Sequence, residues 1–344
     1  MKRRGVLAGI AGGGAMLSLP LTSDAIPVAD IKQWHLSTDV LVAGSGAAGL
    51  AAAIDARRAG ADVLLVEKLN RYGGSSSLSG GVVYCGGGTA LQKSLGFEHT
   101  VEAMYGYIAE SGRKHPHLDK IQLYCEQSVE HFDWLVGNGV PYNKQFTPAK
   151  GLSFDESSLY FSGNEEAWPW RDKWAPIPRG HVPWEKGHQG GRKLMRTLIA
   201  SAQKQGVAMM KRVAGERLVL AGDGRVVGAV VTIAGERKAI KARRGVVLAC
   251  GGFIHNRDMV KQHAPELYDV SAPWANAGDT GDGILMGVGV GASAIRMDQG
   301  FSIGPIYAKT RPCASFTGYH GCRTISHRFA SAGSQGISRR QDGG

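Results

Sequence analysis

A glycine-rich hexapeptide, GSGAAG at residues 44–49, lies between an apolar run and an alanine-rich stretch, and it constrains the fold more than any other feature. The preceding run DVLVA is typical of a buried strand, and Ala47–Arg58 is typical of a helix that Gly60 ends. DVLLVE then forms a second buried run. Strand, glycine turn, helix and strand in this order predict one βαβ unit.

The spacing of the glycines predicts what the turn binds. Gly44 permits a tight turn, Gly46 lets a pyrophosphate approach the backbone, and Gly49 lets helix and strand pack closely. The helix N-terminus offers free N–H groups and a positive dipole end to phosphates. Glu67 closes the second strand about 20 residues later, where a carboxylate accepts hydrogen bonds from a ribose and repels a 2′-phosphate. We therefore predict a dinucleotide site that disfavours NADP, with a tight turn that binds no ligand as the plainer alternative.

Periodicity and turn signals predict the remaining elements. Apolar residues recur at helical spacing over Leu118–Gly139 and over residues 192–205. The stretch Val207–Arg244 alternates apolar and polar residues around two turn signals, which predicts a small antiparallel meander. GVVLACGGF after it predicts a further central strand, and NAGDTGDG predicts a loop before a helix. The tryptophan- and proline-rich stretch at 142–191 is typical of a long ordered loop.

Composition excludes several classes of protein. The 344 residues are 43% hydrophobic, enough for one large core or two ordinary ones, and the 50 glycines cluster between apolar runs as in an α/β ligand binder. The net charge is +11, but no long basic run or basic amphipathic helix accompanies it, so we expect no nucleic-acid partner. The 5 cysteines form no CxxC or CxxCH motif, so no metal site, haem attachment or disulfide framework is predicted.

The two ends differ in character from the rest of the chain. Residues 1–25 have a basic start, a moderate apolar stretch and small residues at its end, which predicts a signal peptide. Arg3 and Arg4 suggest the twin-arginine route and a periplasmic destination, and the stretch is too short and interrupted for a stable membrane span. Beyond about Arg311 aliphatic residues almost vanish, which indicates either a disordered tail or a shifted reading frame that shortens the chain.

Four segments together resemble a known family. VLVAGSGAAGLAAAIDARRAGADVLLVEK, GGSSSLSGG, RRGVVLACGGF and GDTGDGILMGVGVGA are similar, in order and separation, to the FAD-binding flavoproteins of the fumarate reductase and succinate dehydrogenase family. Within that family they resemble the 3-ketosteroid Δ1-dehydrogenase branch. The resemblance covers about residues 38 to 300 and implies an α/β, Rossmann-like FAD-binding domain: a parallel central sheet with helices and a small antiparallel meander, incomplete at its C-terminus.

The resemblance also implies a division of the chain and a set of cofactor-binding residues. A FAD-binding domain at 26–300, with a helical and loop insertion at about 85–190, would follow the signal peptide, and 301–344 would be a stub of a substrate-capping domain with an atypical tail. Asp282 would meet the cofactor or serve only as a helix N-cap, and backbone around Val213–Gly215 would contact adenine. The residues implied to hold FAD are Gly44, Gly46, Ala48, Gly49, Glu67, Gly74, Ser75, Ser76, Gly80, Gly81, Gly251, Gly252 and Asp282.

Two departures from the family pattern bear on the chemistry. Members with covalent FAD have a histidine where this chain has Ser77 and Leu78, so noncovalent FAD is expected. Fumarate reductases have a histidine and threonine pair where this chain reads MDQGFSIGPIYAKT, so fumarate is a poor substrate. The resemblance implies an oxidoreductase that moves a hydride between flavin and a carbon–carbon bond next to a carbonyl, in an enone or 3-ketosteroid-like substrate. A nonenzymatic remnant and an NAD-dependent dehydrogenase are the alternatives.

No catalytic acid or base can be assigned from the sequence. Tyr84, Tyr160 and His181 are conceivable lining groups near the flavin loop, although each is more typical of a structural hydrogen bond. Cys250 is typical of a small buried apolar residue rather than a redox group. The tryptophans of residues 168–184 and Phe161 favour an apolar small-molecule substrate, or else only pack the glycine-rich loop. The electron donor or acceptor is not identified by any haem or iron–sulfur motif.

Overall fold

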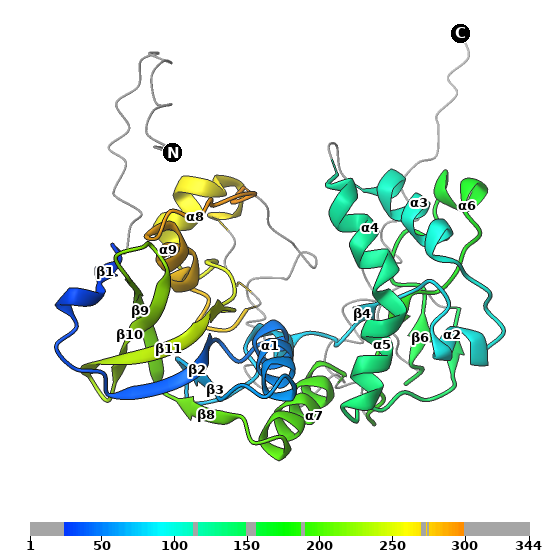
Figure 1. Cartoon of the computed structure of the whole chain (residues 1–344). Coiled ribbons are helices and arrows are strands. Elements are labelled where there is room, and N and C mark those ends of the chain that lie inside the picture. Colours follow the sequence, from blue (N-terminus) through cyan, green and yellow to red (C-terminus); the bar gives the residue numbers. More distant parts are fainter. Residues whose placement is uncertain are drawn as a thin grey trace, which may run out of the picture.

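The computed structural model describes residues 24–112, 116–148, 156–186, 190–269, 273 and 275–298. The expectations for the signal segment at 1–25, apart from its last two residues, and for 301–344 lie outside the described residues. Figure 1 shows two parts, a large sheet with its helices and a smaller helical part, with α1 and α7 between them. Among the described residues no helix is long and apolar enough to cross a membrane.

The βαβ unit predicted from the sequence is confirmed and lies at the centre of the large sheet. Strand β2 (Leu36–Ala43) leads through the glycine turn into α1 (Ala47–Arg58), and β3 (Val63–Glu67) follows. The two strands are parallel, with Val40 opposite Val63 and Ala43 opposite Val66. All five residues of β3 are buried, because helices or strands cover both faces of the sheet.

The large sheet has seven strands in the order β1-β9-β10-β11-β2-β3-β8. The contacts of β11 with β2, β2 with β3, and β3 with β8 are parallel, whereas β10 is antiparallel to both β9 and β11. This confirms a parallel core with an antiparallel meander. The remaining strands of the sheet are β1 (Ile26–Pro27), β8 (Ala208–Lys211), β9 (Val213–Leu220), β10 (Val226–Ile233) and β11 (Glu236–Leu248).

Two sequence expectations about this sheet are wrong in detail. The meander does not begin at Val207, because β8 pairs in parallel with β3 rather than with β9. The predicted strand GVVLACGGF is not separate either, since the last meander strand continues into it as the single strand β11. Pairing of β11 with β2 begins at Ile240 and so overlaps its pairing with β10 at Ile240 and Lys241. A register shift between Ala242 and Gly245, where Gly245 has φ +156°, then interrupts the ladder with β2.

Helices α1 and α7 (Gly190–Lys204) cover one face of the large sheet, where Leu50, Ile54 and Leu198 pack on Val42 and Leu65. The opposite face carries α9 (Asp282–Val288), whose Met286 packs among the strands. Alternate residues of β2 therefore enter different cores, as a strand buried on both faces requires. The remaining elements of this part are η1 (Val28–Asp30), η2 (Ser75–Leu78), α8 (Arg257–His263) and η3 (Pro265–Leu267).

The smaller part contains short strands in the order β4-β7-β6-β5 and several helices. Its amphipathic segment was expected to be one helix over Leu118–Gly139, but it forms α4 and α5 with a break at Gln127. At the break, the Ser128 hydroxyl accepts a hydrogen bond from the Gly86 backbone N–H (2.9 Å). The elements of this part are β4 (Val83–Tyr84), α2 (Ala90–Ser94), α3 (Val101–Ser111), α4 (Leu118–Glu126), α5 (Ser128–Gly137), β5 (Phe146–Thr147), β6 (Leu159–Tyr160), α6 (Trp170–Lys173) and β7 (Gly180–His181).

Candidate functional site

The glycine turn between β2 and α1 admits no side chain at two of its positions. Gly44 has φ +104°, and a Cβ there would lie 2.2 Å from the Ala249 carbonyl oxygen. A Cβ on Gly49 would lie 1.9 Å from the Gly44 carbonyl oxygen. Both glycines therefore allow the backbones of β2, α1 and the end of β11 to approach one another closely, as the sequence predicts.

Gly46 differs, because a side chain there would make only an ordinary van der Waals contact. A Cβ on Gly46 would have the Ser76 hydroxyl as its nearest neighbour, at 3.6 Å. Gly46 is the N-cap of α1, and its carbonyl accepts the first helical hydrogen bond, from Leu50 N–H (3.0 Å). The N–H groups before Leu50 have no acceptor within the helix, although that of Ala47 donates to the Ser76 hydroxyl (3.2 Å). The arrangement suits an anion that binds at the positive end of the helix dipole.

Glu67 ends β3 beside this turn and is buried, with 8% of the residue exposed to solvent. It accepts hydrogen bonds from the Ser45 backbone N–H (3.2 Å), the Ser45 hydroxyl (2.5 Å) and the Leu69 N–H (2.9 Å). The Ser45 hydroxyl in turn accepts from the Gly73 N–H (3.0 Å). Glu67 thus holds the glycine turn in place, and its predicted hydrogen bond to a ribose stays a prediction.

A loop of residues 275–281, here called the strap, lines the same pocket as the glycine turn and contacts η2. The Ser75 hydroxyl in η2 donates to the Asp279 carboxylate (2.6 Å) and accepts from the Asn276 N–H (2.8 Å). Gly251, at φ +79°, makes room for this carboxylate, because a Cβ there would lie 2.4 Å from Asp279 Oδ1. Ser75 therefore ties the predicted flavin loop to the strap.

Asp282 begins α9 directly after the strap, but it is not the N-cap of that helix. The N-cap is Gly281, in the left-handed region, and no side chain caps the helix there. The Asp282 carboxylate instead forms an ion pair with Lys68 (2.7 Å) and accepts from the Thr280 hydroxyl (2.8 Å). The alternative of a cap alone is therefore wrong.

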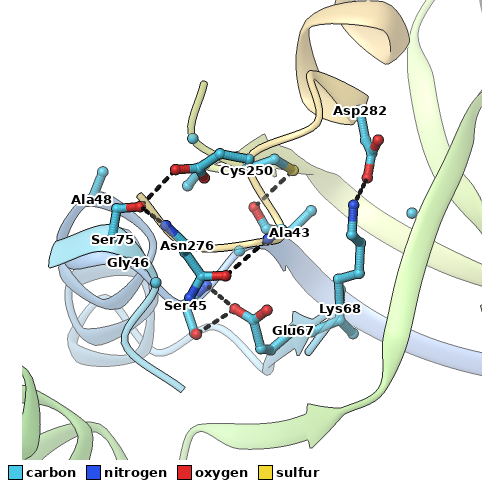
Figure 2. Close-up of a pocket in the computed structure, with 18 of the residues that line it drawn as sticks. Ala43, Ser45, Gly46, Ala48, Glu67, Lys68, Ser75, Cys250, Asn276 and Asp282 are labelled. Atoms are coloured by element: carbon cyan, nitrogen blue, oxygen red, sulfur yellow. Dashed lines mark hydrogen bonds and ion pairs between the residues drawn. The ribbon is translucent and has the colours of Figure 1, made fainter. Parts of the chain in front are cut away.

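One pocket unites these groups, and nine of the predicted cofactor-binding residues line it. Figure 2 shows Ser45, Glu67, Lys68, Ser75 and Asp282 around it. The predicted residues in its lining are Gly44, Gly46, Ala48, Glu67, Gly74, Ser75, Ser76, Gly251 and Asp282. Val213 and Gly215, named for adenine contacts, also line it.

Four predicted residues are not among those that line the pocket. Gly49 lies against the Gly44 carbonyl oxygen of the glycine turn. The Gly252 carbonyl accepts a hydrogen bond from the Gly281 N–H (3.0 Å). Gly80 and Gly81 pack backbone to backbone against the start of α7, where a Cβ on Gly81 would lie 2.3 Å from the Gly190 carbonyl carbon. Gly49, Gly80 and Gly81 thus permit close packing within the protein, whereas a Cβ on Gly252 would have no atom within 4 Å.

Sequence reasoning missed several polar residues of the pocket. Ser45, Lys68, Asn276 and Asp279 all line it. Two signals could have found them: Lys68 directly follows Glu67, and NAGDTGDG carries two further polar side chains at an expected ligand loop. Their roles depend on contacts between segments some 200 residues apart in the sequence, such as Lys68 to Asp282, which no local pattern reveals.

The conceivable catalytic groups lie elsewhere or are inert. Tyr84 donates to Glu165 (2.8 Å), and His181 is fully buried with Thr89 at 2.9 Å. Tyr160 is also buried, and none of these three is among the lining residues. Cys250 lines the pocket, but burial raises the pKa of its thiol to about 11, so it stays a thiol at neutral pH.

The aromatic residues considered for substrate binding do not form one surface. Phe161 packs edge-on against Phe146, with ring centroids 5.7 Å apart. Trp174 lies over Gly106, where a Cβ would be 2.1 Å from the indole. Trp168 and Trp184 are exposed. Phe161 and Trp174 thus pack within the protein, against Phe146 and against Gly106 of α3 rather than against the glycine-rich loop.

The chain is similar to proteins of known family over most of its described length. A family model described as FAD binding domain matches residues 39–305. A probable fumarate reductase of Shewanella frigidimarina is 31% identical over 262 residues, which are 76% of this chain and 40% of the relative. The 3-oxo-5-alpha-steroid 4-dehydrogenase of Comamonas testosteroni is 35% identical over 215 residues, which are 60% of this chain and 39% of the relative. The chain thus spans about half the length, or less, of these curated relatives.

A solved structure agrees in both sequence and fold. The 3-ketosteroid-Δ4-(5α)-dehydrogenase of Rhodococcus jostii RHA1, solved in complex with 4-androstene-3,17-dione, is 41% identical with a TM-score of 0.76. The match covers 80% of this chain and 58% of that one. The glycine turn, the free N-terminus of α1 and the acid at the end of β3 fit the phosphates and ribose of a dinucleotide. With the family match, these features establish that the chain belongs to the FAD binding domain family and that FAD is its cofactor.

Proposed function

We propose that this chain is the FAD-binding part of an oxidoreductase that moves a hydride between flavin and a carbon–carbon bond next to a carbonyl. FAD supplies the hydride chemistry when bound. The residues of this chain bind and orient it: the glycine turn and α1 receive the pyrophosphate, Glu67 faces the ribose, and Gly74, Ser75 and Ser76 face the flavin side. We infer noncovalent attachment, because Ser77 and Leu78 offer no histidine.

The observation that carries the proposal is the 41% identity, over 80% of this chain, to a dehydrogenase solved with a 3-ketosteroid. The 35% identity to a 3-oxo-5-alpha-steroid 4-dehydrogenase supports the same substrate class. Fumarate is disfavoured, because the segment after α9 lacks the histidine that the fumarate reductase pattern requires. We therefore propose an apolar 3-ketosteroid or related cyclic enone as the substrate, with a redox partner still to be identified.

The experiment has two stages that separate binding from catalysis. The purified chain is first incubated with FAD and desalted, and the visible flavin spectrum of the protein fraction is recorded. The loaded protein is then mixed anaerobically with a saturated 3-ketosteroid, and bleaching of the flavin absorbance is followed, with free FAD plus steroid as the control. Separately, photoreduced protein is mixed with 4-androstene-3,17-dione or with fumarate, and reoxidation is followed.

Each outcome decides between functions. Bleaching by the ketosteroid, without reoxidation by fumarate, supports the proposal. Reoxidation by fumarate alone would replace it with a fumarate reductase. A flavin spectrum without any reaction would indicate a binding protein without catalysis. A protein fraction that stays colourless would indicate that this chain does not retain FAD.

We also propose that residues 1–25 direct export to the periplasm by the twin-arginine route. The proposal rests on Arg3 and Arg4 directly before an apolar stretch. Replacing both arginines with lysine should retain the protein in the cytoplasmic fraction of a host that has this route. Unchanged fractionation would refute the route.

A further inference from the structure

We propose that the ion pair between Lys68 and Asp282, here called the clasp, retains FAD by holding the strap across the pocket. Lys68 comes directly after β3, and Asp282 begins α9. Their charged atoms are 2.7 Å apart, and Lys68 also donates to the Thr280 hydroxyl (2.6 Å). Figure 2 shows Lys68 extended toward Asp282 at one side of the pocket.

The strap has few attachments to the wall that carries the glycine turn. Its backbone bonds to residues 252–255, from Gly281 N–H to Gly252 and from His255 N–H to Asp279, hold it on its own side. In the described part of the chain, the polar contacts that cross to the other wall are made by Ser75 at one side and Lys68 at the other. The strap residues between them line the pocket, so loss of the clasp frees one side of the strap.

The charges around the pocket give Lys68 a second effect on the same ligand. Three carboxylates line the pocket, those of Glu67, Asp279 and Asp282, and among the lining residues that the structure describes Lys68 alone is a cation. FAD brings two phosphate charges to this site. Without Lys68, no cationic side chain among the described lining residues offsets the repulsion between the three carboxylates and the phosphates, which weakens binding.

The solvent exposure of the clasp links its strength to the cofactor. The side chains of Lys68 and Asp282 are 31% and 33% exposed, so water and salt partly screen the pair. A nucleotide that fills the pocket beside them excludes water and strengthens their attraction. By the same linkage, a stronger clasp slows the release of FAD.

The test measures FAD release directly and so does not depend on the substrate or on turnover. Lys68→Met and Asp282→Asn remove each charge at nearly constant volume, and the two changes are also combined. The dissociation rate of FAD is followed by the recovery of flavin fluorescence after dilution into a flavin scavenger. Urea unfolding of the FAD-free proteins checks that each variant folds, and Lys68→Arg tests rescue of the charge.

The wild-type protein must first retain FAD, which the two-stage experiment above establishes. We expect each single variant to release FAD roughly three- to tenfold faster than the wild type. The double variant should release FAD no faster than the faster-releasing of the two single variants, because the pair acts as a unit. Lys68→Arg should release FAD at close to the wild-type rate, because it keeps the positive charge. Added salt should reduce the difference in release rate between the wild type and the charge-removing variants. Lys173→Met, which breaks the exposed pair with Glu110 far from the pocket, should release FAD at the wild-type rate.

Three results would overturn the proposal. Effects of the two single changes that simply multiply in the double variant would show that the pair does not act as a clasp. Unchanged release in Lys68→Met would show that the cation does not retain FAD. Slower release in Asp282→Asn would show that Asp282 only repels the cofactor.

Discussion

Replacement of Gly46 by alanine separates cofactor binding from folding. Gly46 has φ −66° and ψ −177°, which alanine adopts without strain, and the added methyl would have only the Ser76 hydroxyl nearby, at 3.6 Å. The folded protein without FAD should therefore accept the change. Loss of backbone freedom in the unfolded chain should even raise the free energy of unfolding by about 0.4–1 kcal/mol.

The same methyl projects into the space where the pyrophosphate is predicted to approach the backbone. It keeps a phosphate oxygen from hydrogen-bond distance of the N–H groups at the start of α1. A hydrogen bond to a charged group contributes about 1.5–3 kcal/mol. Loss of one such bond should raise the Kd for FAD roughly ten- to hundredfold, since each 1.4 kcal/mol is about a factor of ten.

The assay pairs a flavin-fluorescence titration of wild type and Gly46→Ala with urea unfolding of both proteins without FAD. We expect an unchanged or slightly higher urea midpoint together with weakened FAD binding. A variant that binds FAD as tightly as wild type would refute the placement of the pyrophosphate at Gly46. A variant that loses more than about 1 kcal/mol of stability would refute the open surroundings of this position.

Two further predictions concern stability. Gly44→Ala should destabilise the protein by on the order of 3 kcal/mol more than Gly60→Ala, measured by urea unfolding, because both have positive φ but only Gly44 would force a Cβ against the Ala249 carbonyl; equal losses would contradict this. Burial lowers the pKa of His181 to about 4 from its ordinary 6.5, so the unfolded state binds more protons below neutrality. The contribution of His181 to the free energy of unfolding is therefore fully present above pH 6.5 and is lost as the pH falls toward 4. Between pH 7 and pH 5 the loss should be about 2 kcal/mol, and a urea midpoint that does not change with pH would contradict this prediction.

Local patterns were sufficient for the centre of the fold. Helix α1 has the bounds expected from the alanine-rich run, and Gly60 follows its end with φ +81°. The glycine spacing also placed Gly44, Gly46 and Glu67 correctly around one pocket. These inferences succeed because a strand, a turn and a helix that are adjacent in sequence make their decisive contacts with one another.

Predictions failed where the bounds of an element depend on contacts with other segments of the chain. Strand β11 was divided into a meander strand and a central strand, because its sequence changes character where its partner changes from β10 to β2. The helix expected over Leu118–Gly139 is broken at Gln127, next to a serine that accepts a hydrogen bond from Gly86. Hydrophobic periodicity describes burial, and it cannot register a bond to a distant segment.

The sequence by itself determined the βαβ unit, its glycine turn and a site for a dinucleotide, because these depend on backbone freedom and spacing within some 30 residues. FAD in particular was implied by the resemblance over about residues 38 to 300. Only the tertiary structure decided that Glu67 holds Ser45, that Ser75 holds the strap, and that Asp282 pairs with Lys68 rather than capping its helix. Each of these contacts joins groups from separate elements, and the last two span more than 200 residues. Such contacts exist only once the sheet has brought the carboxyl ends of β3 and β11 to the same edge.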